Sequence, residues 1–262
     1  MKITNKHDLP SPLYRCICWA VERYEGPKLS DMALTKKISV TTLINPPRLT
    51  LLRAQHDAEL EVDASDLMYL VQGIAFHHLM AEVGFIEEGF VSETRVDRSF
   101  EGWVISGGYD VLGSKERLLS DWKWTSVWSV VSPRFEWAAQ LNLYRWLEQG
   151  RGGTIDRLEN WAALRDWSQT KANKDKRIPE IPFARLGQKV WADVVTEAYI
   201  RDRLALYDRA LSRYTTSGNN ANVVECCTPE ERWERGPNKP ARCMDYCDVA
   251  QFCSYGKAYR KS

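Results

Sequence analysis

The stretch that decides the fold runs from residue 103 to residue 124 and reads WVISGGYDVLGSKERLLSDWKW. Its two β-rich segments, 103–112 and 118–124, are separated by a polar break, which predicts two neighbouring strands. A third β-rich segment, 90–96, precedes them, and residues 160–165 predict another strand further along the chain. These segments are expected to form the sheet around which the rest of the chain folds.

Segments with helical periodicity lie on both sides of these strands. A helix capped by Asp63 or Ser65 is expected to run to about Val83, and another is expected over 135–147. Further helices are expected over 12–25, closed by Gly26-Pro27, over 48–60 and over 186–214, with a surface loop over 168–176. The order of elements predicts an α/β (α+β) fold, in which helices flank a central sheet and the N-terminal part is helical.

A Ser-Gly-Asn-Asn linker at 217–220 precedes a Cys-rich tail. We expect residues 1–222 to form a core with N-terminal helices, and residues 223–262 to form a metal- or cluster-binding tail packed on it. The N-terminus is polar, and no apolar run of about 18 residues exists, so neither a secretory signal nor a membrane-spanning helix is expected. The protein is therefore expected to be cytoplasmic, where thiols stay reduced and the seven Cys residues are more often ligands or buried groups than disulfides.

The formal net charge of +1 weakly opposes a nucleic-acid enzyme but does not exclude one, because acidic residues elsewhere can offset a basic cleft. Eleven Trp residues are present, and some can be stacking surfaces for bases while others pack in the core. Of those near the central strands, Trp122 is expected to face inward, and Trp124 and Trp128 either pack or stack.

Two carboxylates and a lysine carry the chemistry. A hairpin-like pairing can bring Asp110 opposite Asp121, and strand alternation puts Asp121 and Lys123 on one face. Facing carboxylates are costly unless a cation lies between them, and Mg²⁺ prefers such oxygen ligands. Lys123 beside the metal can help position water or stabilise charge on a phosphate, which indicates metal-assisted phosphodiester hydrolysis. The alternative is an Asp that caps a turn and a solvated lysine.

Two flanking features strengthen this interpretation. His77 lies on the helix that ends near Val83 and can add an imidazole ligand, which suits Mn²⁺ as well as Mg²⁺, although a core or surface role is common for a helical His. Gln140 and Tyr144 are four residues apart on the helix after the lysine strand, so they share one face and can hold Lys123 or touch DNA.

The tail contains Cys243, Cys247 and Cys253 in close succession, a spacing that suits zinc or an iron–sulfur cluster. A fourth ligand is needed, and the candidates in order of nearness are Cys227, Cys226, and Cys16 or Cys18. The alternative is that the thiols are simply buried among the aromatic residues of the tail.

The order of these motif residues resembles that of the PD-(D/E)xK nuclease superfamily, most of all its RecB-like exonuclease branch of phage-encoded and CRISPR-associated enzymes. The segment ISVTTLINPPR at 38–48 is also similar to the phage members. This resemblance implies a restriction-endonuclease-like mixed sheet and a [4Fe–4S] cluster on the tail cysteines, with zinc as the alternative. It implies that the metal ligands are His77, Asp110, Asp121 and the main-chain carbonyl of Trp122. It implies that the catalytic residues are Asp110, Asp121, Lys123, Gln140 and Tyr144.

This sequence departs from the family where Ala81 stands at a position that often holds Glu, and Glu93 is a further acidic candidate near the site. The function expected is a Mg²⁺- or Mn²⁺-dependent DNA exonuclease of phage or prokaryotic recombination, repair or processing, acting on ends or single strands. A recombination partner protein or a homo-oligomer is a further expectation, and by the resemblance the cell is prokaryotic or phage-infected. The alternative is a catalytically silent, DNA-binding nuclease-like subunit or CRISPR adaptation factor.

Overall fold

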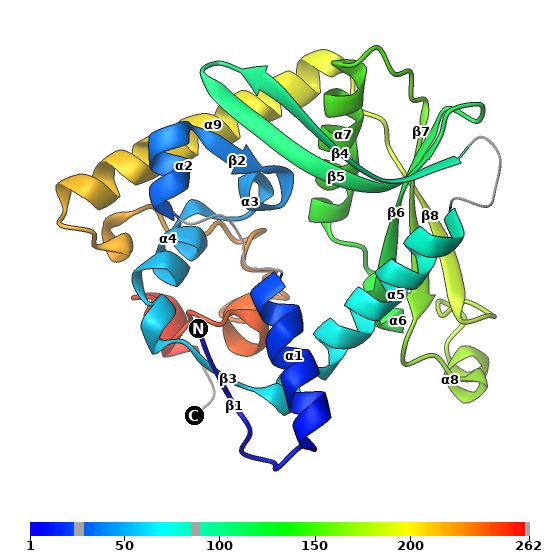
Figure 1. The fold of residues 1–262 in the computed structure, drawn as a ribbon, viewed down its shortest axis with the longest axis horizontal. Coiled ribbons are helices and arrows are strands. Elements are labelled where there is room, and N and C mark those ends of the chain that lie inside the picture. The colour runs from blue at the N-terminus through cyan, green and yellow to red at the C-terminus, as the bar shows by residue number, and fades with distance from the viewer. Residues whose placement is uncertain (24–28, 85–89, 260–262) are drawn as a thin grey trace. The chain divides into compact units, whose positions relative to one another are not determined.

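The computed structural model describes residues 1–23, 29–84 and 90–259 (Figure 1). The chain divides into two compact units. The terminal unit consists of Met1–Leu67, Glu101–Trp103 and Tyr199–Ser262, and the sheet unit consists of Met68–Phe100 and Val104–Ala198. The expected end of the first helix, at 24–28, lies outside the described residues.

The sheet unit carries the central strands. Its elements are α5 (Met68–Gly84), β4 (Phe90–Phe100), β5 (Trp103–Gly113) from Val104 on, β6 (Leu118–Thr125), α6 (Val127–Val131), α7 (Phe135–Gln149), β7 (Arg157–Leu164), α8 (Gln169–Lys174), β8 (Phe183–Gln188) and the start of α9 (Asp193–Thr216). The strands follow the order β5, β6, β7, β8, and β4 pairs with β5. Pairing is antiparallel between β5 and β6, parallel between β6 and β7, and antiparallel between β7 and β8.

The predicted mixed sheet flanked by helices is therefore confirmed. The parallel step from β6 to β7 is possible because α6 and α7 connect the two strands, whereas antiparallel neighbours need only short turns. Helix α7 buries an apolar face that includes Ala139, Leu143 and Leu147, each with no exposed surface. The expected helix over 135–147 is thus confirmed, with its end at Gln149.

Two predictions in the second half of this unit were wrong in part: the helix expected over 186–214 is present but starts later, and the expected loop over 168–176 contains a short helix. Residues 186–188 belong to strand β8 rather than to a helix, because pairing with β7 extends the sheet there, and α9 begins only at Asp193. The segment 168–176 is not entirely loop, since it contains α8, whose first turn is capped by the Ser168 hydroxyl accepting from the Lys171 amide. Local capping and sheet pairing outweighed the polar composition of these segments.

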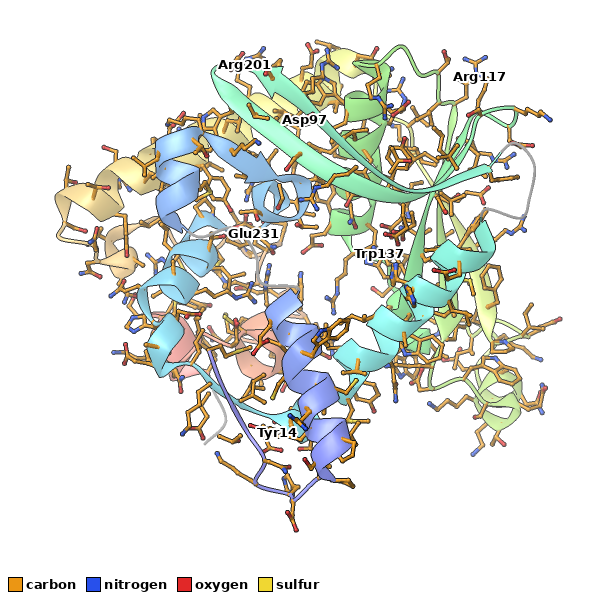
Figure 2. All side chains as sticks on the ribbon, in the orientation of Figure 1. Tyr14, Asp97, Arg117, Trp137, Arg201 and Glu231 are labelled. Atoms are coloured by element: carbon orange, nitrogen blue, oxygen red, sulfur yellow. The ribbon has the colours of Figure 1, made fainter. Side chains whose placement is uncertain are left out.

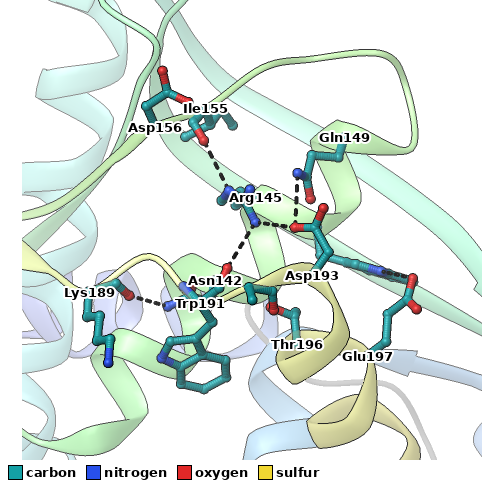
Figure 3. Close-up of polar contacts among 12 residues, drawn as sticks. Asn142, Arg145, Gln149, Ile155, Asp156, Lys189, Trp191, Asp193, Thr196 and Glu197 are labelled. Atoms are coloured by element: carbon teal, nitrogen blue, oxygen red, sulfur yellow. Dashed lines mark hydrogen bonds and ion pairs between the residues drawn. The ribbon is translucent and has the colours of Figure 1, made fainter.

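The segment between β8 and α9 is tied to α7 by polar contacts (Figure 3). The amide of Asn142 donates to the carbonyl of Lys189 and accepts from the Trp191 amide, at 3.0 and 2.8 Å. Arg145 pairs with Asp193 at 2.7 Å, and Gln149 donates to the same carboxylate. These contacts fix the start of α9 on the face of α7 and hold both in place beside the sheet.

The terminal unit is mainly helical, as expected for the N-terminal part. Its elements are β1 (Lys2–Thr4), α1 (Ser11–Arg23), α2 (Leu29–Thr35), β2 (Lys37–Ser39), α3 (Val40–Ile44), α4 (Pro47–Gln55), β3 (Glu61–Asp63), most of α9, and short helical turns at Asp57–Glu59, Ala64–Leu67, Ala221–Val223, Arg242–Tyr246 and Gly256–Ala258. The Cys-rich residues 223–262 lie in this unit together with the N-terminal helices. Among the described residues, no helix combines the length and apolar character needed to cross a membrane.

Candidate functional site

The two aspartates lie where the pairing of β5 with β6 ends. The recorded register joins Val111 to Ser120, so Asp110 and Asp121 are the next residues on their strands. The carboxylate of Asp110 accepts a hydrogen bond of 2.7 Å from the main-chain amide of Trp122. The hairpin expected from the sequence is confirmed, and its side-chain contact anchors Asp110 beside β6.

His77 and Glu93 lie with Asp110 in one group of potential metal ligands. His77 Nδ1 lies 3.4 Å from an Asp110 oxygen, and one ligand atom each of His77, Glu93 and Asp110 lies within 4.8 Å of the other two. Glu93 has a φ of +51° in the middle of β4, an uncommon conformation for a residue other than glycine. Imidazole and carboxylate donors at this spacing can hold a divalent cation such as Mg²⁺ or Mn²⁺.

Neighbouring charges shift the pKa values of His77 and Asp121. Burial lowers the pKa of His77, but the hydrogen bond and charge of Asp110, with the charge of Asp121, raise it overall. Asp121 is 4% exposed, and burial raises its pKa, while Lys123 opposes the shift and Asp110 reinforces it. The Asp121 carboxylate is buried, that of Asp110 is half-buried and that of Glu93 is exposed. Carboxylates this close together are stabilised in their charged form by a neighbouring positive charge, which a divalent ion would supply.

Lys123 is held by contacts on two sides. Its ammonium forms an ion pair with Asp121 and donates a 3.0 Å hydrogen bond to the Gln140 side chain. Gln140 in turn donates to the Tyr144 hydroxyl at 2.8 Å. Trp137, on the same helix (Figure 2), has its ring centre 5.9 Å from the Lys123 nitrogen. The α7 face that carries Gln140 and Tyr144 therefore contacts Lys123, as the sequence predicted. This contact fixes the position of the ammonium group.

Tyr144 reaches this position because of a glycine in β5. A Cβ at Gly107 would lie 2.6 Å from a ring carbon of Tyr144, so only glycine lets the ring approach. Burial raises the pKa of Tyr144, and its hydroxyl therefore stays protonated at neutral pH. At the neighbouring Gly108, a Cβ would meet nothing closer than 3.8 Å.

The opposite face of β6 is packed with aromatic rings. Trp122 meets Phe76 of α5 with ring centres 5.9 Å apart and Trp161 of β7 at 4.9 Å, while Trp124 meets Phe76 at 5.3 Å. The inward packing expected for Trp122 is confirmed. By fixing α5 against the sheet, these rings also fix His77, which follows Phe76 in the chain.

The structure adds two residues that the sequence did not suggest. Asn160 of β7 is directly paired with Asp121, has no exposed surface, and donates to the Asp121 carboxylate at 3.5 Å. The Gln188 side chain of β8 donates to the side-chain oxygen of Asn160 at 2.9 Å. Polar residues on buried strands are uncommon, which is the one signal that the sequence held for Asn160. This chain of amides orients the Asp121 carboxylate.

The cysteines of the tail line a small pocket in the terminal unit. The cavity has a volume of about 20 Å³, and its lining residues include Arg48, Arg232, Cys226, Cys227, Cys243, Cys247 and Cys253. A hydrogen bond with Cys226, followed by burial, raises the pKa of Cys253 to about 12. Burial raises the pKa of Cys243 to about 11, and the charges of Cys247, Cys253 and Cys226 add to the shift.

These contacts distinguish the candidate fourth cysteines. The Cys226 thiol contacts that of Cys253 and lies 4.0 Å from Arg232, whereas the recorded contact of Cys227 is its main-chain carbonyl, which accepts from Arg232. Cys18 instead has a hydrogen bond with Tyr14, and Cys16 is an exposed residue of α1. Buried thiols with raised pKa values resist ionisation, and a bound cationic centre would reverse that preference.

At the level of sequence, no family model and no curated protein matches this chain. Among solved structures, SSO0001 aligns over 97% of this chain and 99% of its own length, with a TM-score of 0.58 and 15% identity. At that identity the likeness shows a shared fold alone. A phage-related exonuclease from Haemophilus somnus 129PT aligns over 78% of this chain and 94% of its own, with 17% identity and a TM-score of 0.38, too low to carry an argument.

Proposed function

We propose that the sheet unit is a divalent-metal-dependent deoxyribonuclease that hydrolyses phosphodiester bonds from DNA ends. The observation that carries this proposal is the arrangement around Asp110 and Lys123: a group of His77, Glu93 and Asp110 ligand atoms within 4.8 Å, beside a lysine held between Asp121 and Gln140. His77, Glu93, Asp110 and Asp121 would hold the ion, which when bound supplies positive charge and acidifies water.

Four side chains around the proposed metal site have separate roles in the proposed reaction. Lys123 keeps its ammonium beside the Asp121 carboxylate, where it can donate a hydrogen bond to a phosphate oxygen as negative charge develops. Gln140 and Tyr144 prevent that ammonium from turning away, since each link of the chain is a hydrogen bond of at most 3.0 Å. Asn160 donates to the carboxylate of Asp121 and so limits its rotation.

Cleavage of end-labelled DNA tests this function. The purified chain should shorten single- or double-stranded substrates from their ends with Mg²⁺ or Mn²⁺ and do nothing in EDTA. Lys123→Ala should reduce the rate at least about a hundredfold, the usual scale for losing one such group. Lys115→Ala, in the exposed turn between the same strands, is the matched control and should keep full activity.

Two outcomes would contradict the proposal. Full activity of Lys123→Ala would show that the lysine takes no part in cleavage. DNA binding without any cleavage under either metal would instead support the alternative, a catalytically silent DNA-binding subunit. Products released from internal positions would contradict the exonuclease assignment while leaving the nuclease assignment intact.

We also propose that the tail binds a [4Fe–4S] cluster through Cys226, Cys243, Cys247 and Cys253. The Cys226 and Cys253 thiols are in contact, and Cys243 and Cys247 line the same cavity, so the four thiols gather around one space. Clustered thiolates of this kind suit an iron–sulfur cluster, with zinc as the alternative. A brown protein containing iron and sulfide is expected, and colourless protein with stoichiometric zinc would contradict it.

A further inference from the structure

An exposed aromatic side chain in the sheet unit carries an arginine on its ring. Tyr69, in the first turn of α5, is 60% exposed, and the guanidinium of Arg165 lies 4.1 Å from its ring centre. Arg165 directly follows β7, and its amide donates to the carbonyl of Thr125 at the end of β6. The pair therefore lies at the same end of the two central strands.

A second exposed ring is tied to this pair through Asp166. The Asp166 carboxylate accepts from the Val127 amide at 2.8 Å, which starts α6, and it pairs with Lys171 at 3.2 Å. Trp128, the next residue of α6, is 53% exposed, while its neighbours Val127 and Val130 are buried in the core. The helix thus packs through its valines and presents its tryptophan to solvent.

The chain around these rings is basic. The segment 165–177 has five basic and two acidic side chains. Lys174, Lys176 and Arg177 are exposed on α8 and just beyond it. Exposed aromatic rings beside clustered positive charge match the chemistry of a single nucleic-acid strand, whose bases stack and whose phosphates are anionic.

This surface starts close to the proposed catalytic centre. Thr125, which accepts from the Arg165 amide, is two residues beyond Lys123 on β6, about 7 Å along a strand. We propose that Tyr69, Trp128 and the basic segment 165–177 form a surface that binds single-stranded DNA next to the cleavage site. This inference rests on the proposed nuclease function, and it assigns the strand preference to these two rings.

The physical reason for a strand preference is access to base faces. In a duplex the bases are stacked on one another and their faces are covered, so Tyr69 and Trp128 gain little from contact with it. A single strand offers each base face freely, and stacking on an aromatic side chain contributes about 1–3 kcal/mol per base. The basic segment contacts phosphates of either form and adds affinity without preference.

Binding without cleavage tests the surface. Fluorescence anisotropy in EDTA would follow a labelled oligothymidylate of about 20 nucleotides, and a duplex of the same length, on the full chain. Trp128→Ala and Tyr69→Ala should each weaken binding of the single strand about tenfold and change duplex binding less than about twofold. Trp19→Ala removes a ring of α1 that is 56% exposed and is the matched control, with no expected change.

Charge variants complete the test. Replacing Lys174 and Lys176 together by Ala should weaken binding of the single strand and of the duplex by the same factor. The slope of affinity against salt concentration should fall by an amount that corresponds to about two lost phosphate contacts. Unchanged single-strand affinity in Trp128→Ala and Tyr69→Ala, or an equal loss for the duplex, would overturn the proposed surface. These results do not depend on cleavage. A chain that binds through Trp128 but never cleaves would refute the nuclease and leave the surface standing.

Discussion

Gly107 sets how closely α7 approaches the strand that bears Asp110. Gly107→Ala would place a methyl group 2.6 Å from the Tyr144 ring, which must then move away from Gln140. We expect a loss of about 1–3 kcal/mol in the free energy of unfolding, measured by urea denaturation. Cleavage should also fall, because the support of Lys123 is disturbed.

Gly108→Ala is the matched control for that substitution. Its Cβ would meet nothing closer than 3.8 Å, so the free energy of unfolding should stay the same or rise by up to about 1 kcal/mol. Equal destabilisation by both substitutions would mean that strand flexibility, rather than the Tyr144 contact, is the reason for glycine at 107.

Asn160 is expected to act on Asp121 without touching substrate. In Asn160→Ala, the Asp121 carboxylate keeps its ion pair with Lys123 but loses a second contact that orients it, so the Mn²⁺ concentration for half-maximal cleavage should rise about 10–100-fold. Cleavage at saturating Mn²⁺ should recover most of its rate. A lower maximal rate with an unchanged metal requirement would rule out this positioning role.

At the scale of elements, one buried carboxylate joins β1 to β3. Asp63 accepts from the amide of Lys6 and from the Thr4 hydroxyl across the strand pair, and from both the amide and hydroxyl of Ser65. These hydrogen bonds hold the pKa of Asp63 well below its usual range. The carboxylate therefore stabilises the fold more in its charged form than in its protonated form.

The sign of the pH dependence follows directly. A lowered folded-state pKa gives stability that is fully present above the unfolded value, near 3.9, and is lost as pH falls through the folded value. The melting temperature of Asp63→Asn should lie below that of the wild type at neutral pH. That gap should narrow as pH falls below about 4. A constant gap over this range would contradict the assignment.

The parallel pairing of β6 with β7 could not be predicted from local sequence patterns. The four segments expected as strands are strands, because alternating and β-branched residues fit a pleated surface. Residues 186–188 are a strand because their backbone groups pair with those of β7. Pairing of this kind depends on distant residues, so a local pattern could not predict it.

At the scale of the whole molecule, the cysteine pocket ties the tail to α4. Arg48 of α4 donates to the carbonyls of Val224 and Asn222 and lies 4.0 Å from the Cys253 sulfur. Cys226→Ser should lower the metal content and the melting temperature of the purified protein. Cys227→Ser should change both much less, because the structural contact of Cys227 uses its main chain. Greater loss in Cys227→Ser would restore Cys227 as the fourth ligand.

The sequence by itself predicted four strands, the α7 face and the candidate site residues, because alternation and helical spacing are local properties of the chain. It named Asp110, Asp121, Lys123, Gln140 and Tyr144 but could not order their contacts. Only the tertiary structure decided that Glu93 turns toward His77, that Asn160 and Gln188 support Asp121, and that Cys226 meets Cys253. These contacts join residues far apart in the chain, and their distances are set by packing between elements rather than by spacing along the sequence.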